Sequence, residues 1–205
     1  MSKLKLYGIA NSRALRSLWA IEECEVEYEH VPTSFMEEAK TEDYLAINPN
    51  GKIPTLVDDD LILFESMAIN LYLARRYATS LYPSDQAKQA LVLQWSVWAI
   101  SEIEPPQMEM VIDMFMTPQE KRSGNTRDRA ERKLERPLAV LDKHLAEKKW
   151  LVGDNFSIGD LNVAAVMQLL KLVKFDYSSF SHVKKWADSC YARPAFSRAK
   201  AVGTS

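Results

Sequence analysis

The 205-residue sequence contains few of the residues that build metal sites, disulfide frameworks or membrane spans. Its two cysteines, Cys24 and Cys190, lie far apart and match no Cys-x-x-Cys or metal-ligand spacing. The histidines also occur singly, at His30, His144 and His182, so we expect no metal site. No apolar run is long enough to cross a bilayer, and no apolar signal-peptide core follows the first charges. These absences favour a cytoplasmic protein.

The sequence also lacks an excess of either charge. Lys and Arg number 26 and Asp and Glu 28, which gives a formal net charge of -2. The densest basic stretch, Arg127 to Arg136, is interleaved with acidic residues and is typical of a solvated helix face. Because a general nucleic-acid binder needs a concentrated positive surface, we expect no nucleic-acid partner.

The start of the sequence has the pattern of a small α/β domain. Leu4 to Ile9 is a short apolar run typical of a strand, and Val26 to Val31 alternates like a second strand. Between them, Arg13 to Glu23 has the spacing of a helix. Strand, helix and strand in so few residues indicate a βαβ unit with parallel strands.

A hairpin and a second helix complete this domain. Thr55 to Val57 and Leu61 to Phe64 are apolar runs separated by three aspartates, the pattern of a hairpin with an acidic turn. The preceding segment, Asn48 to Pro54, is dense in turn formers. Helical spacing resumes over Met67 to Tyr77. We therefore predict a mixed sheet flanked by helices.

Beyond this domain the sequence predicts helices alone. Ala87 to Ile103 is strongly helical, and Pro105-Pro106 is expected to kink or end that helix. Arg127 to Lys148 forms a second long helical pattern. Ser157 to Asp160 is a Ser-x-x-Asp capping box that opens the apolar helix Leu161 to Val173. The predicted fold class is α+β, with a first domain at residues 1–78, a linker at 79–86 and an all-helical domain at 87–205.

Ser12 lies where the first predicted strand gives way to the first helix. The free amides and positive dipole end of a helix favour a nearby anion, and a serine hydroxyl there can donate to a thiolate. A hydrogen bond to a charged partner contributes roughly 1.5–3 kcal/mol, equivalent to a thiol pKa lower by roughly one to two units. Alternatively, Ser12 or Asn11 is simply the N-cap. Spacing alone favours the N-cap, because strand-Ser-helix is a weak motif.

Ile53-Pro54 is the second candidate feature. Proline at the start of a strand disturbs the ladder least, and an X-Pro bond in a tight turn is where cis isomers occur. A cis bond would turn the amide and carbonyl of Ile53 away from the sheet, where they could pair with an extended peptide. A trans proline that closes a loop is an equal alternative.

The third candidate is the start of the helix after the hairpin. Ser66 is expected to cap this helix, and Ile69 supplies no capping-box carboxylate for its free amides. A ligand carboxylate could bind there, while Glu65 pairs a ligand ammonium. A plain N-cap preceded by a surface glutamate is the alternative. All three segments lie at strand ends or helix starts of one domain, which favours a common cleft.

These motifs resemble those of the cytosolic glutathione S-transferases, in particular the bacterial serine-type members. The resemblance covers nearly the whole sequence. Four motifs carry it, in the order of the family: the serine four residues before Arg16, the segment Asn48 to Leu56, the segment Glu65 to Ile69, and the capping box at Ser157 to Asp160. The resemblance implies a thioredoxin-like N-terminal domain, a helical C-terminal domain that forms the electrophile site, and a homodimer.

The resemblance also implies the role of each candidate residue, with glutathione as co-substrate. Ser12 matches the serine that stabilises the glutathione thiolate, and the amide of Asn11 is an alternative donor. Tyr7 lies too close to Arg16 to match the catalytic tyrosine of animal-type members, so it is interpreted as a strand residue. The remaining candidates bind glutathione: a cis Pro54 with Ile53 on the cysteinyl backbone, Glu65 and Ser66 on the γ-glutamyl end, and Lys52 and Lys40 on the glycyl carboxylate.

Two functions follow. The first is a detoxifying glutathione transferase that directs the thiolate at an apolar electrophile; glutathione-dependent peroxide reduction and isomerisation use the same nucleophile. The second is a non-catalytic relative that acts as a binding or regulatory protein. Helical-domain residues that could meet the electrophile are expected by default to pack in the core: Trp95, Trp98, Met108, Met110, Met114 and Met116. The sequence does not identify the electrophile.

Overall fold

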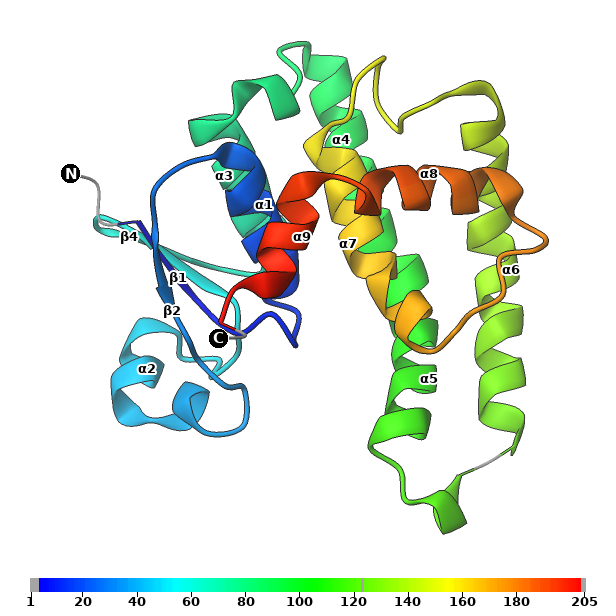
Figure 1. Ribbon diagram of the computed structural model, residues 1–205, viewed down its shortest axis with the longest axis horizontal. Coiled ribbons are helices and arrows are strands. Elements are labelled where there is room, and N and C mark those ends of the chain that lie inside the picture. Colours follow the sequence, from blue (N-terminus) through cyan, green and yellow to red (C-terminus); the bar gives the residue numbers. More distant parts are fainter. Residues whose placement is uncertain (1–3, 123, 204–205) are drawn as a thin grey trace. The chain divides into compact units, whose positions relative to one another are not determined.

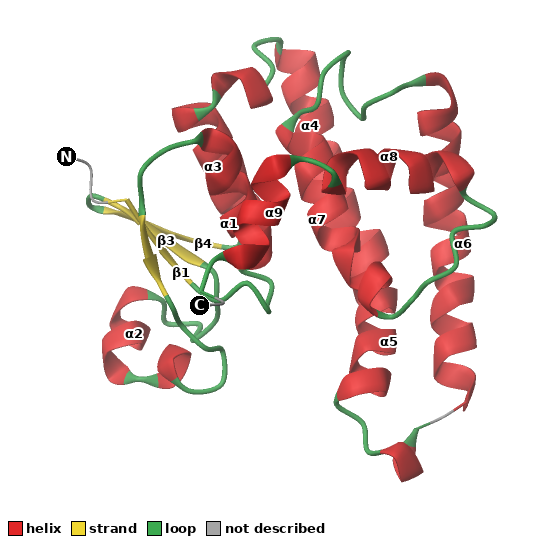
Figure 2. Ribbon diagram, in the orientation of Figure 1, coloured by secondary structure: helices red, strands yellow, loops and turns green. Residues whose placement is uncertain are grey.

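The computed structural model describes residues 4–122 and 124–203. It divides into two compact units, Met1–Ser84 with Ala192–Ser205, and Asp85–Tyr191 (Figure 1). Figure 2 shows that the described strands all belong to the first unit, as the predicted α+β class requires. Residues 1–3, part of the segment in which we expected no signal peptide, lie outside the described residues.

The first unit contains a four-stranded mixed sheet of order β2-β1-β3-β4. The strands are β1 (Leu4–Tyr7), β2 (Glu29–Val31), β3 (Thr55–Asp58) and β4 (Leu61–Phe64). β1 is parallel to β2 and antiparallel to β3, and β3 is antiparallel to β4. These pairings confirm the predicted βαβ unit and hairpin.

β2 is shorter than the predicted strand, which began at Val26. Tyr28 does not join the ladder. Its hydroxyl instead donates to a carboxylate oxygen of Glu22, 2.9 Å away in the preceding helix. The alternating pattern of residues 26–31 therefore has two causes. Its second half forms β2, and Tyr28 in its first half packs back on the preceding helix.

Helix α1 (Leu15–Cys24) packs between α3 (Ser66–Tyr77) and α9 (Pro194–Ala201). Because it has neighbours on both sides, every residue from Leu15 to Ile21 is buried. Two shorter elements, η1 (Glu38–Lys40) and α2 (Glu42–Ile47), connect β2 to β3, and the turn η2 (Thr79–Leu81) follows α3.

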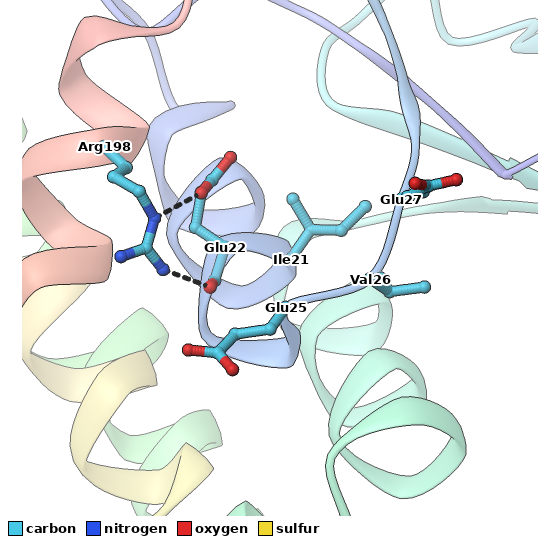
Figure 3. A pocket seen from close by; sticks show the side chains of 6 residues that line it. All are labelled: Ile21, Glu22, Glu25, Val26, Glu27 and Arg198. Atoms are coloured by element: carbon cyan, nitrogen blue, oxygen red, sulfur yellow. Dashed lines mark hydrogen bonds and ion pairs between the residues drawn. The ribbon is translucent and has the colours of Figure 1, made fainter.

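α9 groups with the first unit, whereas the sequence assigned residues 192–205 to the helical domain. Its attachment to α1 is polar and aromatic. Arg193 donates two hydrogen bonds to the carboxylate of Glu23, at 2.6 and 2.7 Å, and the rings of Trp19 and Phe196 have centroids 4.7 Å apart. Arg198 adds two bonds to Glu22 (Figure 3). These pairs join residues about 170 positions apart, which local patterns do not predict.

The described residues of the second unit form helices and connecting loops, with no strand among them. Its elements are α4 (Gln86–Trp98), the π-helical segment η3 (Ala99–Ile103), α5 (Glu104–Phe115), the short turn η4 (Gln119–Lys121), α6 (Gly124–Glu147), α7 (Ile158–Leu172) and α8 (Ser181–Tyr191). The helix expected to kink or end at Pro105-Pro106 changes character just before them, in η3. The prolines then occupy the first turn of α5, where a missing N–H costs no intrahelical bond.

The predicted capping box at the start of α7 is confirmed. Asp160 is fully buried and accepts from the Ser157 amide and hydroxyl, from the Leu151 amide and from the Trp186 indole, all within 3.0 Å. One carboxylate therefore ties α7, α8 and the loop before α7 together. None of the helices that the structure describes is both long and apolar enough to span a membrane.

Candidate active site

Three candidate segments meet at one end of the sheet, where strands β1, β3 and β4 begin or end. Tyr7 ends β1 and pairs with Thr55, and Thr55 pairs with Phe64 on its other side. The three residues therefore form one row across the sheet. The Ser12 loop follows Tyr7, Ile53-Pro54 precedes Thr55, and Glu65-Ser66 follows Phe64. The common cleft predicted from the sequence thus has a basis in strand register.

Ser12 does not cap α1, contrary to the alternative favoured by spacing. The helix begins at Leu15, and its N-cap, Ala14, provides no side-chain hydrogen bond. The half-buried Ser12 hydroxyl donates to the Ile9 carbonyl at 2.7 Å and accepts from the Ala14 amide at 3.0 Å. Asn11 is exposed in the same loop. The hydroxyl is therefore held by its own loop, three positions before the first residue of the helix.

The Ile53–Pro54 peptide bond is cis, as the resemblance implied. Ile53 is 8% exposed and packs with Ala14, Ala39 and Tyr44, while Tyr7 and Ile9 cover the cluster. No hydrogen bond joins the amide or carbonyl of Ile53 to another described residue. This apolar cluster joins the Ser12 loop to the proline loop.

A buried polar network that the sequence analysis missed holds the proline loop. The Asn48 side-chain amide donates to the Lys52 carbonyl at 2.8 Å and to the Thr55 hydroxyl at 2.9 Å. The Tyr44 hydroxyl lies 2.7 Å from each of the same two oxygens. Burial raises the pKa of Tyr44, so the phenol stays protonated and able to donate. The turn-forming segment after Asn48 was the available signal, but its partner Tyr44 lies outside it.

The two candidate lysines differ in their contacts. The Lys40 ammonium donates to the Gly51 carbonyl at 2.5 Å, so it supports the proline loop as well as adding charge near it. The Lys52 side chain is exposed, and its backbone carbonyl is held by Tyr44 and Asn48. Lys52 therefore belongs to the loop that carries Ile53, whereas Lys40 lies in η1 and reaches that loop through its bond to Gly51.

Glu65 and Ser66 lie at the start of α3, but Ser66 is not its cap. Ser66 is the first helical residue and is 6% exposed, and the N-cap position belongs to Glu65, whose side chain makes no capping bond. Glu65 has φ 70 and ψ 111, a backbone conformation that a residue with a side chain rarely adopts. Such conformations occur preferentially at functional sites.

α3 is anchored to α1 close to both candidate segments. The buried Asn70 side chain in α3 donates to the Arg16 carbonyl in α1 at 3.2 Å. This bond ties the first turn of α1 to the first half of α3, so the helices that follow the Ser12 loop and Ser66 are fixed to one another.

The cavity of about 400 Å³ in Figure 3 lies elsewhere in this unit. Its lining residues are Ile21, Glu22, Glu25, Val26, Glu27 and Arg198. They gather at the end of α1 opposite Ser12, and none is a candidate site residue. The candidate site therefore rests on the row of strand ends and on the contacts of its loops.

Family models for the N-terminal and C-terminal domains of glutathione S-transferase match residues 2–75 and 105–194. The chain belongs to the glutathione S-transferase family. A glutathione S-transferase of Hyoscyamus muticus is 33% identical, with 96% of this chain and 97% of that protein aligned. Glutathione S-transferase GstB of Escherichia coli K12 is 32% identical over 94% of this chain and 95% of its own.

Solved glutathione S-transferases share the fold over nearly the whole chain. The theta class enzyme of Xanthomonas axonopodis pv. citri, with glutathione bound, has a TM-score of 0.89 and 29% identity, and both chains are fully covered. Glutathione S-transferase-I with lactoylglutathione bound has a TM-score of 0.87 and 30% identity, with 97% of this chain and 99% of the other covered. The part of the chain that contains the four-stranded sheet is therefore the thioredoxin-like domain of this family, and the helical part that follows matches its C-terminal domain.

Proposed function

We propose that this chain is a serine-type glutathione transferase that binds glutathione at this end of the sheet and stabilises its thiolate with Ser12. The observation that supports this most directly is the row Tyr7, Thr55 and Phe64, since it brings the Ser12 loop, Ile53-Pro54 and Glu65-Ser66 to one end of the sheet. Tyr7 itself is half-buried against the Ile53 cluster, which favours a packing role for it.

In this proposal glutathione lies along the proline loop. The amide and carbonyl of Ile53 pair with the cysteinyl backbone, as a strand is added to a sheet. The γ-glutamyl carboxylate binds Ser66 and the first amides of α3, and Glu65 pairs the γ-glutamyl ammonium. Lys40 and Lys52 neutralise the glycyl carboxylate. Lys52 and Ile53 are neighbours, and Lys40 is bonded to the same loop at Gly51, so with Glu65 and Ser66 they make a single extended site for a tripeptide.

Ser12 then acts on the sulfur. Its hydroxyl can rotate from the Ile9 carbonyl to the thiolate while the Ala14 amide continues to donate to it. A bond to a charged acceptor is stronger than one to a carbonyl, so this exchange favours the ionised thiol. Asn11 is the alternative donor, because its amide lies in the same exposed turn.

The thiolate attacks the electrophile directly. A carbon–sulfur bond forms as the leaving group departs with its electron pair, or as an activated double bond accepts the electrons. The enzyme forms no covalent bond, so the rate enhancement comes from proximity and thiolate stabilisation. We assign the electrophile to the helical unit, where Trp95 and Met110 are core residues and Met116 is 69% exposed.

A homodimer in the cytoplasm belongs to the same proposal. Leu93, Val97 and Ile100 form an exposed apolar stripe at helical spacing along α4 and η3. The edge strand β4 also exposes Leu61, Ile62 and Phe64. Exposed apolar side chains grouped in this way on one element are typical of a protein interface, here with a second copy. The reducing cytoplasm keeps glutathione as the thiol that the chemistry requires.

The experiment is retention on immobilised glutathione combined with turnover of a chlorodinitroarene, an unsaturated carbonyl and an organic hydroperoxide. We expect retention together with turnover of at least one aryl or alkenyl electrophile. Turnover of the hydroperoxide alone would make the chain a glutathione-dependent peroxidase. Retention without any turnover would contradict the enzyme and favour a binding or regulatory protein.

A further inference from the structure

We propose that His30 is a positioning residue for the Ser12 hydroxyl, acting through the Gly8 carbonyl. The inference rests on the proposed role of Ser12. His30 lies in β2, where its backbone pairs with Leu6 of β1, and its side chain reaches the loop that begins after Tyr7. No motif in the sequence connects His30 to Ser12, and the link is made by three consecutive contacts.

The first contact fixes the carbonyl of Gly8. The Nε2 atom of His30 lies 2.8 Å from the Gly8 oxygen. A carbonyl oxygen can only accept, so Nε2 carries the proton and donates it. The half-buried imidazole also lies against Gly203, where a Cβ would stand 3.1 Å from the His30 Cε1 atom. The ring is thus covered on that side.

The second set of contacts fixes the position of Gly8. Its amide donates to the Val31 carbonyl at 3.1 Å, so both polar groups of Gly8 are held from β2. Its φ is +144, and a Cβ on Gly8 would stand 2.4 Å from the Cβ of Ala14. The loop therefore passes close to the start of α1, and the hydrogen bond from His30 selects the orientation of its first peptide.

The third contact transmits this orientation to Ser12. The peptide between Gly8 and Ile9 is planar, so the direction of the Gly8 carbonyl fixes that peptide plane. The next carbonyl, that of Ile9, accepts the Ser12 hydroxyl at 2.7 Å. If the His30 donor is lost, the Gly8–Ile9 peptide can turn and the loop that carries Ser12 shifts with it. The Ser12 oxygen, which the Ala14 amide holds in this loop, then no longer lies where its hydroxyl can donate to the thiolate.

The test compares His30→Leu with His30→Gln, because the Gln side-chain nitrogen can replace Nε2 as a donor. The readout is thiolate absorbance against pH at saturating glutathione, with kcat and KM measured in parallel. For His30→Leu we expect the pKa of bound glutathione to rise by about one unit and kcat near neutrality to fall about tenfold. KM for glutathione should change less than about twofold, because Ile53, Glu65 and Ser66 are untouched. His30→Gln should restore most of both values.

His144 provides a matched control, since its Nε2 also lies 3.0 Å from a backbone carbonyl, that of Leu151 in the helical unit. His144→Leu removes the same kind of hydrogen bond and should leave the thiol pKa unchanged. Thermal unfolding of each variant checks that it is folded. If His30→Leu shifts the pKa no more than His144→Leu does, or if His30→Gln fails to restore it, the positioning role is wrong.

A Ser12→Ala background separates this inference from the proposed function. There, His30→Leu should add little to the thiol pKa, because the group it positions is gone. If Ser12→Ala shifts the pKa and His30→Leu does not, the function stands and the inference fails. If Ser12→Ala itself leaves the pKa unchanged, both fail at the serine.

Discussion

The Ser12 hydroxyl donates to the Ile9 carbonyl, 2.7 Å away, and so closes its own loop rather than capping α1. A capping serine accepts an amide from inside the helix, and its hydrogen can point anywhere. Here the Ala14 amide fixes the oxygen and the Ile9 carbonyl fixes the hydrogen. The hydroxyl therefore has a defined direction, and a ligand sulfur must compete with the Ile9 carbonyl for its hydrogen.

Replacing Lys40 should destabilise the protein and replacing Lys52 should not, whereas both replacements should weaken the binding of glutathione. Lys40→Met removes the bond to the Gly51 carbonyl and should lower the free energy of unfolding by about 1 kcal/mol. Lys52→Met should leave it unchanged, because the Lys52 ammonium makes no hydrogen bond to another described residue. Both variants should bind glutathione more weakly than the wild type. Added salt should reduce this difference in affinity, because it screens the lysine charges. Urea unfolding and calorimetric titration measure the two effects; equal stability of the two variants would contradict the support role of Lys40.

Glu65 should show a glycine preference at a helix start. Glu65→Ala and Glu65→Gly both remove the carboxylate, so both should weaken glutathione binding to a similar degree. Because φ is 70 at this position, Glu65→Gly should be the more stable of the two by about 1 kcal/mol. Thermal or urea unfolding of the pair decides this. If Glu65→Ala were the more stable variant, the positive φ would carry no strain.

Replacing Ser17 by alanine should stabilise the protein. It is fully buried in α1, and its hydroxyl has no hydrogen-bond partner within residues 4–122 and 124–203. Ser17→Ala removes an unsatisfied polar group and improves helix propensity, so the free energy of unfolding should rise by about 1 kcal/mol.

Ser96 is the control for this prediction. It is equally buried, but its hydroxyl donates to the Val92 carbonyl at 2.7 Å and accepts from Asn162 at 2.9 Å. Ser96→Ala should therefore lower stability by about 1–3 kcal/mol. Urea unfolding of both variants is the measurement, and a loss of equal size in Ser17→Ala would contradict the first prediction.

The sequence predicted those features of this molecule that depend on local pattern. Alternation and turn residues located the hairpin β3–β4, and the Ser-x-x-Asp motif located the start of α7. The cis bond at Pro54 followed from the family resemblance. The start of α1 was placed too early, because Ser12 satisfies its hydrogen bonds with Ile9 and Ala14, a local alternative to capping that spacing does not distinguish.

Features that depend on distant partners could not be predicted. The support of the proline loop requires Tyr44 and Asn48 to converge on the oxygens of Lys52 and Thr55. The grouping of α9 with the first unit requires Arg193 to meet Glu23. Such contacts are determined by tertiary packing, and no period or motif in the sequence encodes them.

Asp142 should make the free energy of unfolding depend on pH in the acid range. One oxygen accepts from the amides of His182 and Val183 in the first turn of α8, and the other lies 3.0 Å from the His182 ring. Burial acts to raise the pKa of Asp142, but the hydrogen bonds from His182 and Val183 outweigh it, so the pKa is lowered from 3.8. The folded state therefore prefers the carboxylate, which stabilises the protein above the ordinary pKa.

This share of stability should disappear as pH falls from near 4 through the lowered pKa. Asp142→Asn keeps the shape but not the charge. It should cost about 1 kcal/mol near neutrality and reduce the acid-dependent loss of stability. Urea unfolding at a series of pH values measures both; parallel pH curves for variant and wild type would contradict the assignment.

The absorbance of the glutathione thiolate against pH in Ser12→Ala tests whether the Ser12 hydroxyl stabilises the thiolate. Loss of the hydroxyl should raise the pKa of the bound thiol by roughly one to two units, with turnover falling in proportion at neutral pH. Glutathione affinity should change little, and Asn11→Ala is the matched control from the same turn. An unchanged titration in Ser12→Ala, with the shift found in Asn11→Ala, would contradict the role of Ser12 and make the asparagine the donor.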